Sequence, residues 1–167
     1  MMPARLQLRK RVLADLDFCL AMDVEPGVTR YVIGPWADPV AHREFLLANI
    51  HKTYRSPFGY WMIENPAAAE PRLGWVMAIE EDDGSVELGW RLRPAAWGQG
   101  VATEAARMLL ESIAKADAGR KCVALIQPGN GASIRVAQKL GFVIAGREER
   151  DGVEHLVFAR MSDRGLQ

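Results

Sequence analysis

Residues 93–105 read Arg-Pro-Ala-Ala-Trp-Gly-Gln-Gly-Val-Ala-Thr-Glu-Ala and join an apolar stretch, 86–92, to an amphipathic one that begins at Val101. The apolar stretch predicts a strand. After it, small and apolar residues recur three and four positions apart, the spacing of one buried helix face. Gly98 and Gly100 permit a tight turn, and a helix start offers unpaired backbone N–H groups that favour an anion. The turn therefore predicts a phosphate cradle, although two glycines could equally serve only to shape it.

Two common phosphate-binding motifs do not fit this turn. A P-loop requires Gly-Lys-Ser or Gly-Lys-Thr, whereas Val101 and Ala102 follow the second glycine. The dinucleotide fingerprint requires a third glycine where Thr103 stands. It also requires an acidic residue at the end of the next strand, and that strand ends at Gln127.

A second stretch, residues 126–142, reads Ile-Gln-Pro-Gly-Asn-Gly-Ala-Ser-Ile-Arg-Val-Ala-Gln-Lys-Leu-Gly-Phe. It follows an apolar run, 121–126, that predicts a buried strand. Asn130 is expected to cap a short helix that runs to Leu140. Gly141 stands where a left-handed C-cap would end that helix.

Together the two stretches resemble the GNAT family of acyl-CoA-dependent N-acetyltransferases. Residues 97–102 lie on the family's Gln/Arg-x-x-Gly-x-Gly/Ala pyrophosphate motif, and residues 130–133 with 139–142 lie on its second motif. The resemblance spans nearly the whole chain. It implies an α/β fold with a mixed, mostly antiparallel sheet of about seven strands, splayed in the middle and flanked by about four helices. A single domain over 1–167 is expected.

Residues 6–9, 15–17 and 87–90 look like the subgroup that includes the ribosomal-protein alanine N-acetyltransferases. Two positions depart from the common family pattern. Trp97 occupies the Gln/Arg position of the first motif, as in that subgroup. Ala137 stands where many members carry a tyrosine that protonates the leaving thiolate, so the usual general acid is missing.

The resemblance implies acetyl-CoA as cosubstrate, with pantetheine lying like an extra strand along residues 90–92. Asn130 could pair with a pantetheine amide or be only a helix cap, and Lys139 could meet the 3′-phosphate of CoA or be only solvated. The residues expected to bind acetyl-CoA are Trp90, Arg91, Leu92, Trp97, Gly98, Gln99, Gly100, Val101, Ala102, Thr103, Asn130, Ser133 and Lys139.

Acetyl transfer to an amine needs a neutral amine and a proton for the departing thiolate, because an alkylammonium has a pKa near 10.4. Glu87 could face the splayed centre of the sheet and steer the amine or a water, or be an exposed strand residue. Ser133 could donate a proton to the CoA sulfur, or only satisfy an amide of the first helical turn. Direct attack is expected, without a covalent intermediate on Cys122.

The function predicted from these residues is transfer of an acetyl group from acetyl-CoA to a primary amine, either a protein N-terminus or a small molecule. The alternative is a module that binds acyl-CoA without turnover. The closing hairpin carries glutamates that are weaker base candidates. Nothing in the sequence separates the possible acceptors, and either a monomer or a homodimer is compatible with it.

Composition limits the other partners. The 21 basic and 21 acidic residues give no overall attraction to nucleic acid. No apolar run approaches the roughly twenty residues of a membrane span. Residues 1–5 lack the apolar core of a signal peptide, so a cytoplasmic protein with reduced Cys19 and Cys122 is expected. The three histidines are too scattered for a metal site, and no metal is expected.

The remaining elements are predicted from local signals. The helix over 14–25 should end at Pro26-Gly27, and Asp38-Pro39 should start another that ends near residue 52. The first helix is expected to bury Leu13, Leu16, Leu20 and Ala21, and the second Ala41, Phe45 and Ala48. Strands are expected near residues 6–8 and over 60–63, 73–79, 143–149 and 153–159.

Overall fold

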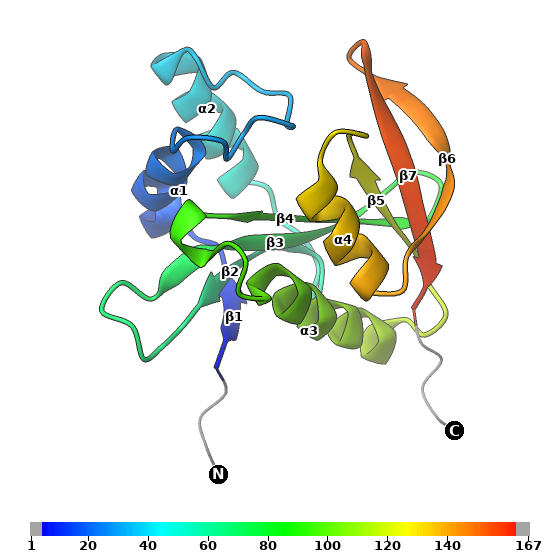
Figure 1. Cartoon of the computed structure of the whole chain (residues 1–167). Coiled ribbons are helices and arrows are strands. Elements are labelled where there is room, and N and C mark those ends of the chain that lie inside the picture. The colour runs from blue at the N-terminus through cyan, green and yellow to red at the C-terminus, as the bar shows by residue number, and fades with distance from the viewer. Residues whose placement is uncertain (1–4, 163–167) are drawn as a thin grey trace.

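A computed structural model describes residues 5–162 and contains a seven-stranded sheet (Figure 1). Residues 1–4 and 163–167 lie outside this range, and with them most of the segment on which the signal-peptide expectation rests. The strands are β1 (Gln7–Lys10), β2 (Gly59–Glu64), β3 (Arg72–Glu80), β4 (Val86–Leu92), β5 (Lys121–Ile126), β6 (Val143–Arg150) and β7 (Val153–Met161). The helices are α1 (Leu16–Asp23), α2 (Pro39–Ile50), α3 (Val101–Ala116) and α4 (Gly131–Lys139).

The strand order is β1-β2-β3-β4-β5-β7-β6, and every neighbouring pair is antiparallel except β4 and β5. This parallel pair is in register only at Val86 with Cys122 and at Glu87 with Val123. Beyond these positions β4 stays with β3 and β5 stays with β7, so the two halves of the sheet diverge toward the carboxyl ends of β4 and β5. The predicted fold, with its splayed mixed sheet, is confirmed.

The sheet buries side chains on both faces. Figure 1 shows α3 on one side of strands β2–β4 and α1 with α2 on the other. Alternate residues of β4, such as Leu88 and Leu92, pack toward α3 in the main core. Trp75 of β3 packs instead against α1 and α2. The odd-numbered residues of β4 lie on this second face, and Glu87 and Arg91 are among them.

The buried faces of α1 and α2 differ from those predicted. Leu13 is 54% exposed because a turn of 3₁₀ helix (Leu13–Asp15) precedes α1 and turns this side chain outward. Phe45 of α2 is also exposed. Apolar residues are spread around α2, so its pattern defined no clear buried face. The residues that these helices actually bury are Leu16, Cys19, Met22 and Asp23 in α1, and His42 and Leu46 in α2.

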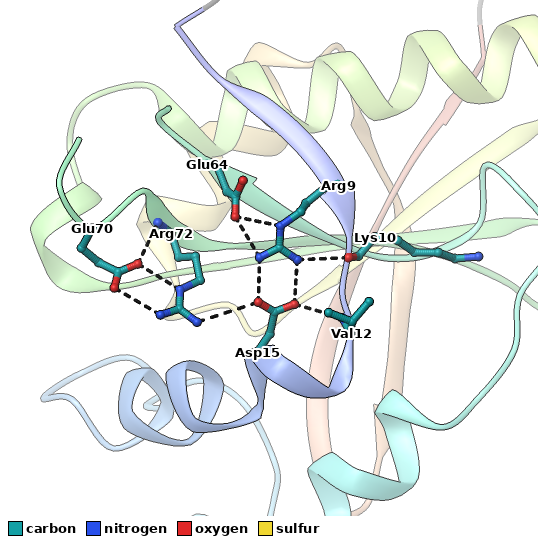
Figure 2. Close-up of polar contacts among 7 residues, drawn as sticks. All are labelled: Arg9, Lys10, Val12, Asp15, Glu64, Glu70 and Arg72. Atoms are coloured by element: carbon teal, nitrogen blue, oxygen red, sulfur yellow. Dashed lines mark hydrogen bonds and ion pairs between the residues drawn. The ribbon is translucent and has the colours of Figure 1, made fainter. Parts of the chain in front are cut away.

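An ionic cluster joins the first strands to the start of α1 (Figure 2). The guanidinium of Arg9 donates two hydrogen bonds, of 2.8 and 2.7 Å, to the buried carboxylate of Asp15, and a third of 2.8 Å to Glu64. Arg72 pairs with Glu70 at 2.9 Å and approaches Asp15 at 3.9 Å. Burial by itself would raise the pKa of Asp15, but the hydrogen bond from Arg9 and the other contacts lower it. This cluster sets two guanidinium groups against three carboxylates, and it ties the edge strand β1 to the start of α1.

Candidate active site

The turn that precedes α3 has the geometry of an anion site. Gly98 and Gly100 have φ angles of +72° and +74°, and Gly100 is the N-cap residue of α3 without a side-chain hydrogen bond to the helix. A Cβ added to either glycine would meet nothing within 4 Å. The first backbone N–H groups of α3 therefore have no side-chain cap and lie beside open space.

Side chains around this turn hold its shape. The indole N–H of Trp97 donates to the carbonyl of Leu92 at 3.0 Å and ties the turn to the end of β4. The amide of Gln99 donates to Ala95 at 2.8 Å, and Arg5 donates to the carbonyl of Gln99 at 2.6 Å. Trp97 is 47% exposed. The predicted residues 97–103 thus form one continuous turn and helix start, in which glycine backbone rather than a basic side chain faces outward.

The second predicted motif forms the start and end of α4. The side-chain oxygen of Asn130 accepts the backbone N–H of Ser133 at 3.2 Å, so the predicted cap is confirmed. With this oxygen engaged by the helix, the amide nitrogen is the group of Asn130 that could donate a hydrogen bond to a ligand. Gly141 has a φ of +82° and follows the last helical turn, as predicted. Ser133 is half-buried in the first turn of α4, whereas Lys139 is exposed in the last.

Strand β4 has an unpaired edge next to the turn. Within the described residues, its pairing with β5 stops at Glu87, so residues 88–92 have β3 on one side and no strand on the other. Trp90 and Leu92 direct their side chains into the main core. Residues 90–92 can therefore contact a ligand mainly through backbone groups. An unpaired strand edge is a template for an extended, amide-containing ligand.

Glu87 lies where the two strands begin to diverge. Its side chain is 17% exposed, and Arg150 of the β6–β7 hairpin donates to its carboxylate at 3.3 Å. Burial, together with the neighbouring carboxyl of Glu81, raises the pKa of Glu87 to about 7. A carboxyl group that titrates near neutral pH is suited to accept a proton from an amine or a water.

Residues 5–143 match the protein family described as "Acetyltransferase (GNAT) domain". The chain belongs to the GNAT acetyltransferase family. It is 31% identical over 140 residues to "Uncharacterized protein YkkB" of Bacillus subtilis (strain 168), with 81% of each chain covered. It is 26% identical over 141 residues to "Uncharacterized N-acetyltransferase p20" of Bacillus licheniformis, with 83% of this chain and 79% of the relative covered.

Solved GNAT structures share the fold. An acetyltransferase (GNAT family) from Bacillus anthracis has a TM-score of 0.79 at 20% identity, covering 95% of this chain and 96% of that one. Aminoglycoside acetyltransferase AAC(6′)-Ib in complex with coenzyme A gives 0.73 at 15% identity, covering 93% and 94%. Ribosomal-protein-S5-alanine acetyltransferase from Vibrio fischeri gives 0.72 at 16% identity, covering 100% and 98%. At these identities the likeness shows the fold alone.

One buried network in this GNAT chain was not predicted. The carboxylate of Asp23, 1% exposed at the end of α1, accepts one hydrogen bond from Arg91 at 2.8 Å and contacts the imidazole of His42 at 2.9 Å. The guanidinium of Arg91 also lies 4.8 Å from the Trp36 ring and 4.9 Å from the Trp75 ring. The only sequence signal was an arginine between the apolar Trp90 and Leu92, since a buried arginine needs a partner.

Other reactive groups lie outside this arrangement. Burial raises the pKa of the Cys122 thiol to about 11, so a nucleophilic thiolate is scarce near pH 7. Ala137 is fully buried in the main core. Among residues 5–162, no group of three or more histidine, cysteine, aspartate or glutamate side chains is placed to hold a metal ion. Over the same residues, no helix is long and apolar enough to cross a membrane.

Proposed function

We propose that this protein transfers an acetyl group from acetyl-CoA to a primary amine by direct attack. One observation carries this proposal: an uncapped, glycine-built helix start lies at the end of a strand whose outer edge is unpaired. The helix start would take the pyrophosphate and the strand edge would take the pantetheine amides. AAC(6′)-Ib, which shares the fold, has been solved with coenzyme A.

The cosubstrate would be held mainly by backbone. The N–H groups of residues 98–103 would donate to the pyrophosphate, and the backbone of 90–92 would pair with pantetheine. The amide nitrogen of Asn130 would add one side-chain contact from the opposite strand. This arrangement would allow a chain with no excess of basic residues to bind a ligand as anionic as CoA.

Glu87 is our proposed general base. It lies at the apex of the diverging strands and titrates near pH 7, so it can take a proton from the ammonium form of the acceptor, directly or through one water. The neutral amine then attacks the thioester carbonyl, the C–N bond forms and the C–S bond breaks. Ser133, in the first turn of α4, is the candidate proton donor that the sequence suggested for the thiolate.

For the acceptor, we propose only the chemical group that reacts. The names of the two structural neighbours refer to an alanine of a ribosomal protein and to an aminoglycoside. Both kinds of acceptor present a primary amine, either a peptide N-terminus or an amino group on a small molecule. We therefore propose the primary amine as the substrate class.

Two measurements test this function together. Calorimetric titration with acetyl-CoA should show binding at one site per chain. A thiol-release screen should then give turnover with peptides that have a free N-terminus or with small primary amines, and none with the same peptides blocked by N-acetylation. Binding without turnover across the panel would favour an acyl-CoA-binding module. Absence of binding would refute the proposed function.

A further inference from the structure

Residues 24–38, which we call the strap, connect α1 to α2 and touch three parts of the candidate site. A Cβ on Gly27 would lie 3.3 Å from the Trp97 ring, so the strap packs against the turn before α3. Trp36 lies over the guanidinium of Arg91 on β4. Tyr31 packs directly on the β5–α4 turn, because a Cβ on Gly129 would lie 3.1 Å from its ring. Figure 1 shows this segment extending from α1 and α2 toward β5 and α4.

The strap is fixed at both ends and at Tyr31. Asp23 immediately precedes it and His42 lies in α2 just after it, and the two side chains are in contact at 2.9 Å. Asp23 is also bonded to Arg91, which ties both ends of the strap to β4. At Tyr31, the backbone carbonyl accepts the side-chain amide of Gln127 at 3.0 Å. The strap therefore spans from one diverging strand to the other, and its contacts hold Tyr31 at the end of β5.

Tyr31 is the tyrosine best placed for chemistry at the diverging strands. The chain has three tyrosines, Tyr31, Tyr54 and Tyr60. Tyr60 is on β2, and strands β3 and β4 lie between it and β5. Tyr54 packs on Tyr60 with ring centroids 6.4 Å apart, and burial raises the pKa of both phenols. Of the three tyrosines, only Tyr31 lies on the strap. Its ring packs against Gly129, the residue before the proposed pantetheine ligand Asn130.

The reaction needs a proton donor at this place. A departing thiolate is the conjugate base of a thiol with an ordinary pKa of about 8.5, and a phenol has an ordinary pKa of about 10. Proton transfer is efficient when the two groups are matched, and an aliphatic hydroxyl such as that of Ser133 is a much poorer match. Ala137 offers no donor at all. A tyrosine side chain reaching the end of β5 from another element would meet the requirement.

We propose that Tyr31 donates its phenolic proton to the CoA sulfur during acetyl transfer. This role rests on the proposed function. The acceptor attacks as the neutral amine, after Glu87 has passed the first proton of the ammonium form to solvent. The nitrogen forms the C–N bond and loses its second proton to Glu87. The C–S bond breaks with its electron pair on sulfur, and sulfur takes the proton from Tyr31. Afterwards the protonated glutamate and the phenolate exchange protons through solvent, which restores both groups.

The test is Tyr31→Phe with Tyr54→Phe as its matched control, since both remove one phenolic hydroxyl. Turnover would be measured with chemistry rate-limiting, and acetyl-CoA affinity by calorimetry. Tyr31→Phe should lower kcat roughly ten- to a hundredfold, at the low end of general-acid effects, and leave the acetyl-CoA Kd within about twofold. The rate of the variant, unlike that of the wild type, should rise with the concentration of an added buffer acid. Tyr54→Phe should match the wild type in both measurements.

Three results would overturn this role. One is a kcat for Tyr31→Phe within about twofold of wild type. Another is an equal loss in Tyr54→Phe, which would indicate a general effect on the fold. The third is a loss of acetyl-CoA affinity that accounts for the loss of rate, which would make Tyr31 a binding residue. Wild-type protein that binds acetyl-CoA and releases no thiol would instead refute the proposed function, and this role with it.

Discussion

The first turns of α3 and α4 solve the same structural problem in opposite ways. Each helix follows one of the two diverging strands, and each exposes unpaired backbone N–H groups at its start. In α4, the side chain of Asn130 accepts one of these groups from Ser133. In α3, Gly100 adopts a left-handed conformation and provides no side chain at all. Helix α2 resembles α4, since Asp38 accepts the N–H groups of Val40 and Ala41.

The difference teaches which helix start is available to a ligand. A side-chain cap stabilises a protein by about 1 kcal/mol, so α3 forgoes this contribution. It can do so because it is 16 residues long and buries an apolar face in the main core, including Ala105, Leu109 and Ile113. A helix start without a side-chain cap is a local weakness in the fold. Such weaknesses are typical of functional sites, and here the free N–H donors lie beside open space.

The largest expected effect comes from closing the open turn. Gly100→Ala would place a methyl group where we propose that the pyrophosphate lies, and acetyl-CoA affinity should fall by about a hundredfold or more, equivalent to roughly 2.7 kcal/mol. Alanine serves better than a larger residue, because the φ of +74° strains any L side chain and a branched Cβ would add to that strain. The measurement is calorimetric titration, accompanied by thermal unfolding.

Gly84→Ala is the control for backbone strain. Gly84 has a φ of +84°, and its Cβ would also meet nothing within 4 Å, but it lies in the hairpin before β4. Both variants should lose similar stability, about 1–2 kcal/mol for a side chain in the left-handed region. Only Gly100→Ala should lose affinity. Equal affinities in the two variants would mean that the turn before α3 does not bind the cosubstrate.

Local sequence patterns predicted both helix starts well. The expected strands 86–92 and 121–126 coincide with β4 and β5, and the glycines and Asn130 stand in the predicted turns. These elements depend on residues close in sequence, for which spacing and turn chemistry are informative. The assignment of residue roles to acetyl-CoA stays a prediction.

What joins the two helix starts could not be predicted in this way. The bond between Asp23 and Arg91 spans 68 positions and that between Tyr31 and Gln127 spans 96, so no local period reports them. The face of α2 was predicted wrongly for the same reason. His42 is buried because it contacts Asp23 on another helix, whereas local hydrophobicity favoured Phe45.

A substitution at Glu87 tests whether proton transfer takes place where β4 and β5, the strands that precede α3 and α4, begin to diverge. Glu87→Gln should lower kcat by about ten- to a hundredfold above pH 7. In the wild type, the rate should rise with pH through an apparent pKa near 7, because the carboxylate is the active form and burial raises its pKa to about 7. The variant should lack this rise. A pH–rate profile with Glu111→Gln as an exposed control would check it, and an unchanged profile in Glu87→Gln would exclude Glu87 as base.

The same carboxyl group should link stability to pH. Its pKa is raised in the folded state, from 4.5 to about 7, so the folded protein holds the proton more tightly than the unfolded chain. The free energy of unfolding should therefore fall as the pH rises from about 4.5 to about 7, and stay lower above that range. Glu87→Gln removes this penalty and should be more stable than wild type at pH 8 by about 1–3 kcal/mol. Denaturant unfolding at pH 5 and pH 8 measures it, and a variant less stable than wild type at pH 8 would contradict it.

Two substitutions at Asn130 can separate its role as a helix cap from its proposed contact with acetyl-CoA. Asn130→Asp retains a side-chain oxygen for the N–H of Ser133 but has no amide donor, so helix stability should persist. Acetyl-CoA affinity should fall by about three- to tenfold, the loss of one hydrogen bond of roughly 0.5–1.5 kcal/mol. Asn130→Ala should lose both affinity and about 1 kcal/mol of stability. If Asn130→Asp binds acetyl-CoA as tightly as wild type, Asn130 is a cap and no more.

Ser133 should show the smallest effect, and it decides between the two proposed proton donors. Its backbone N–H already serves the capping bond with Asn130, which does not depend on the hydroxyl, so Ser133→Ala should fold normally. If Tyr31 protonates the thiolate, removing this hydroxyl should change kcat by less than about threefold and leave acetyl-CoA affinity nearly the same. A loss made only in the transition state would appear in kcat with Kd unchanged. A tenfold or larger fall in kcat at constant Kd, with Tyr31→Phe near wild type, would return the donor role to Ser133. It would also give the capped start of α4 a direct part in catalysis.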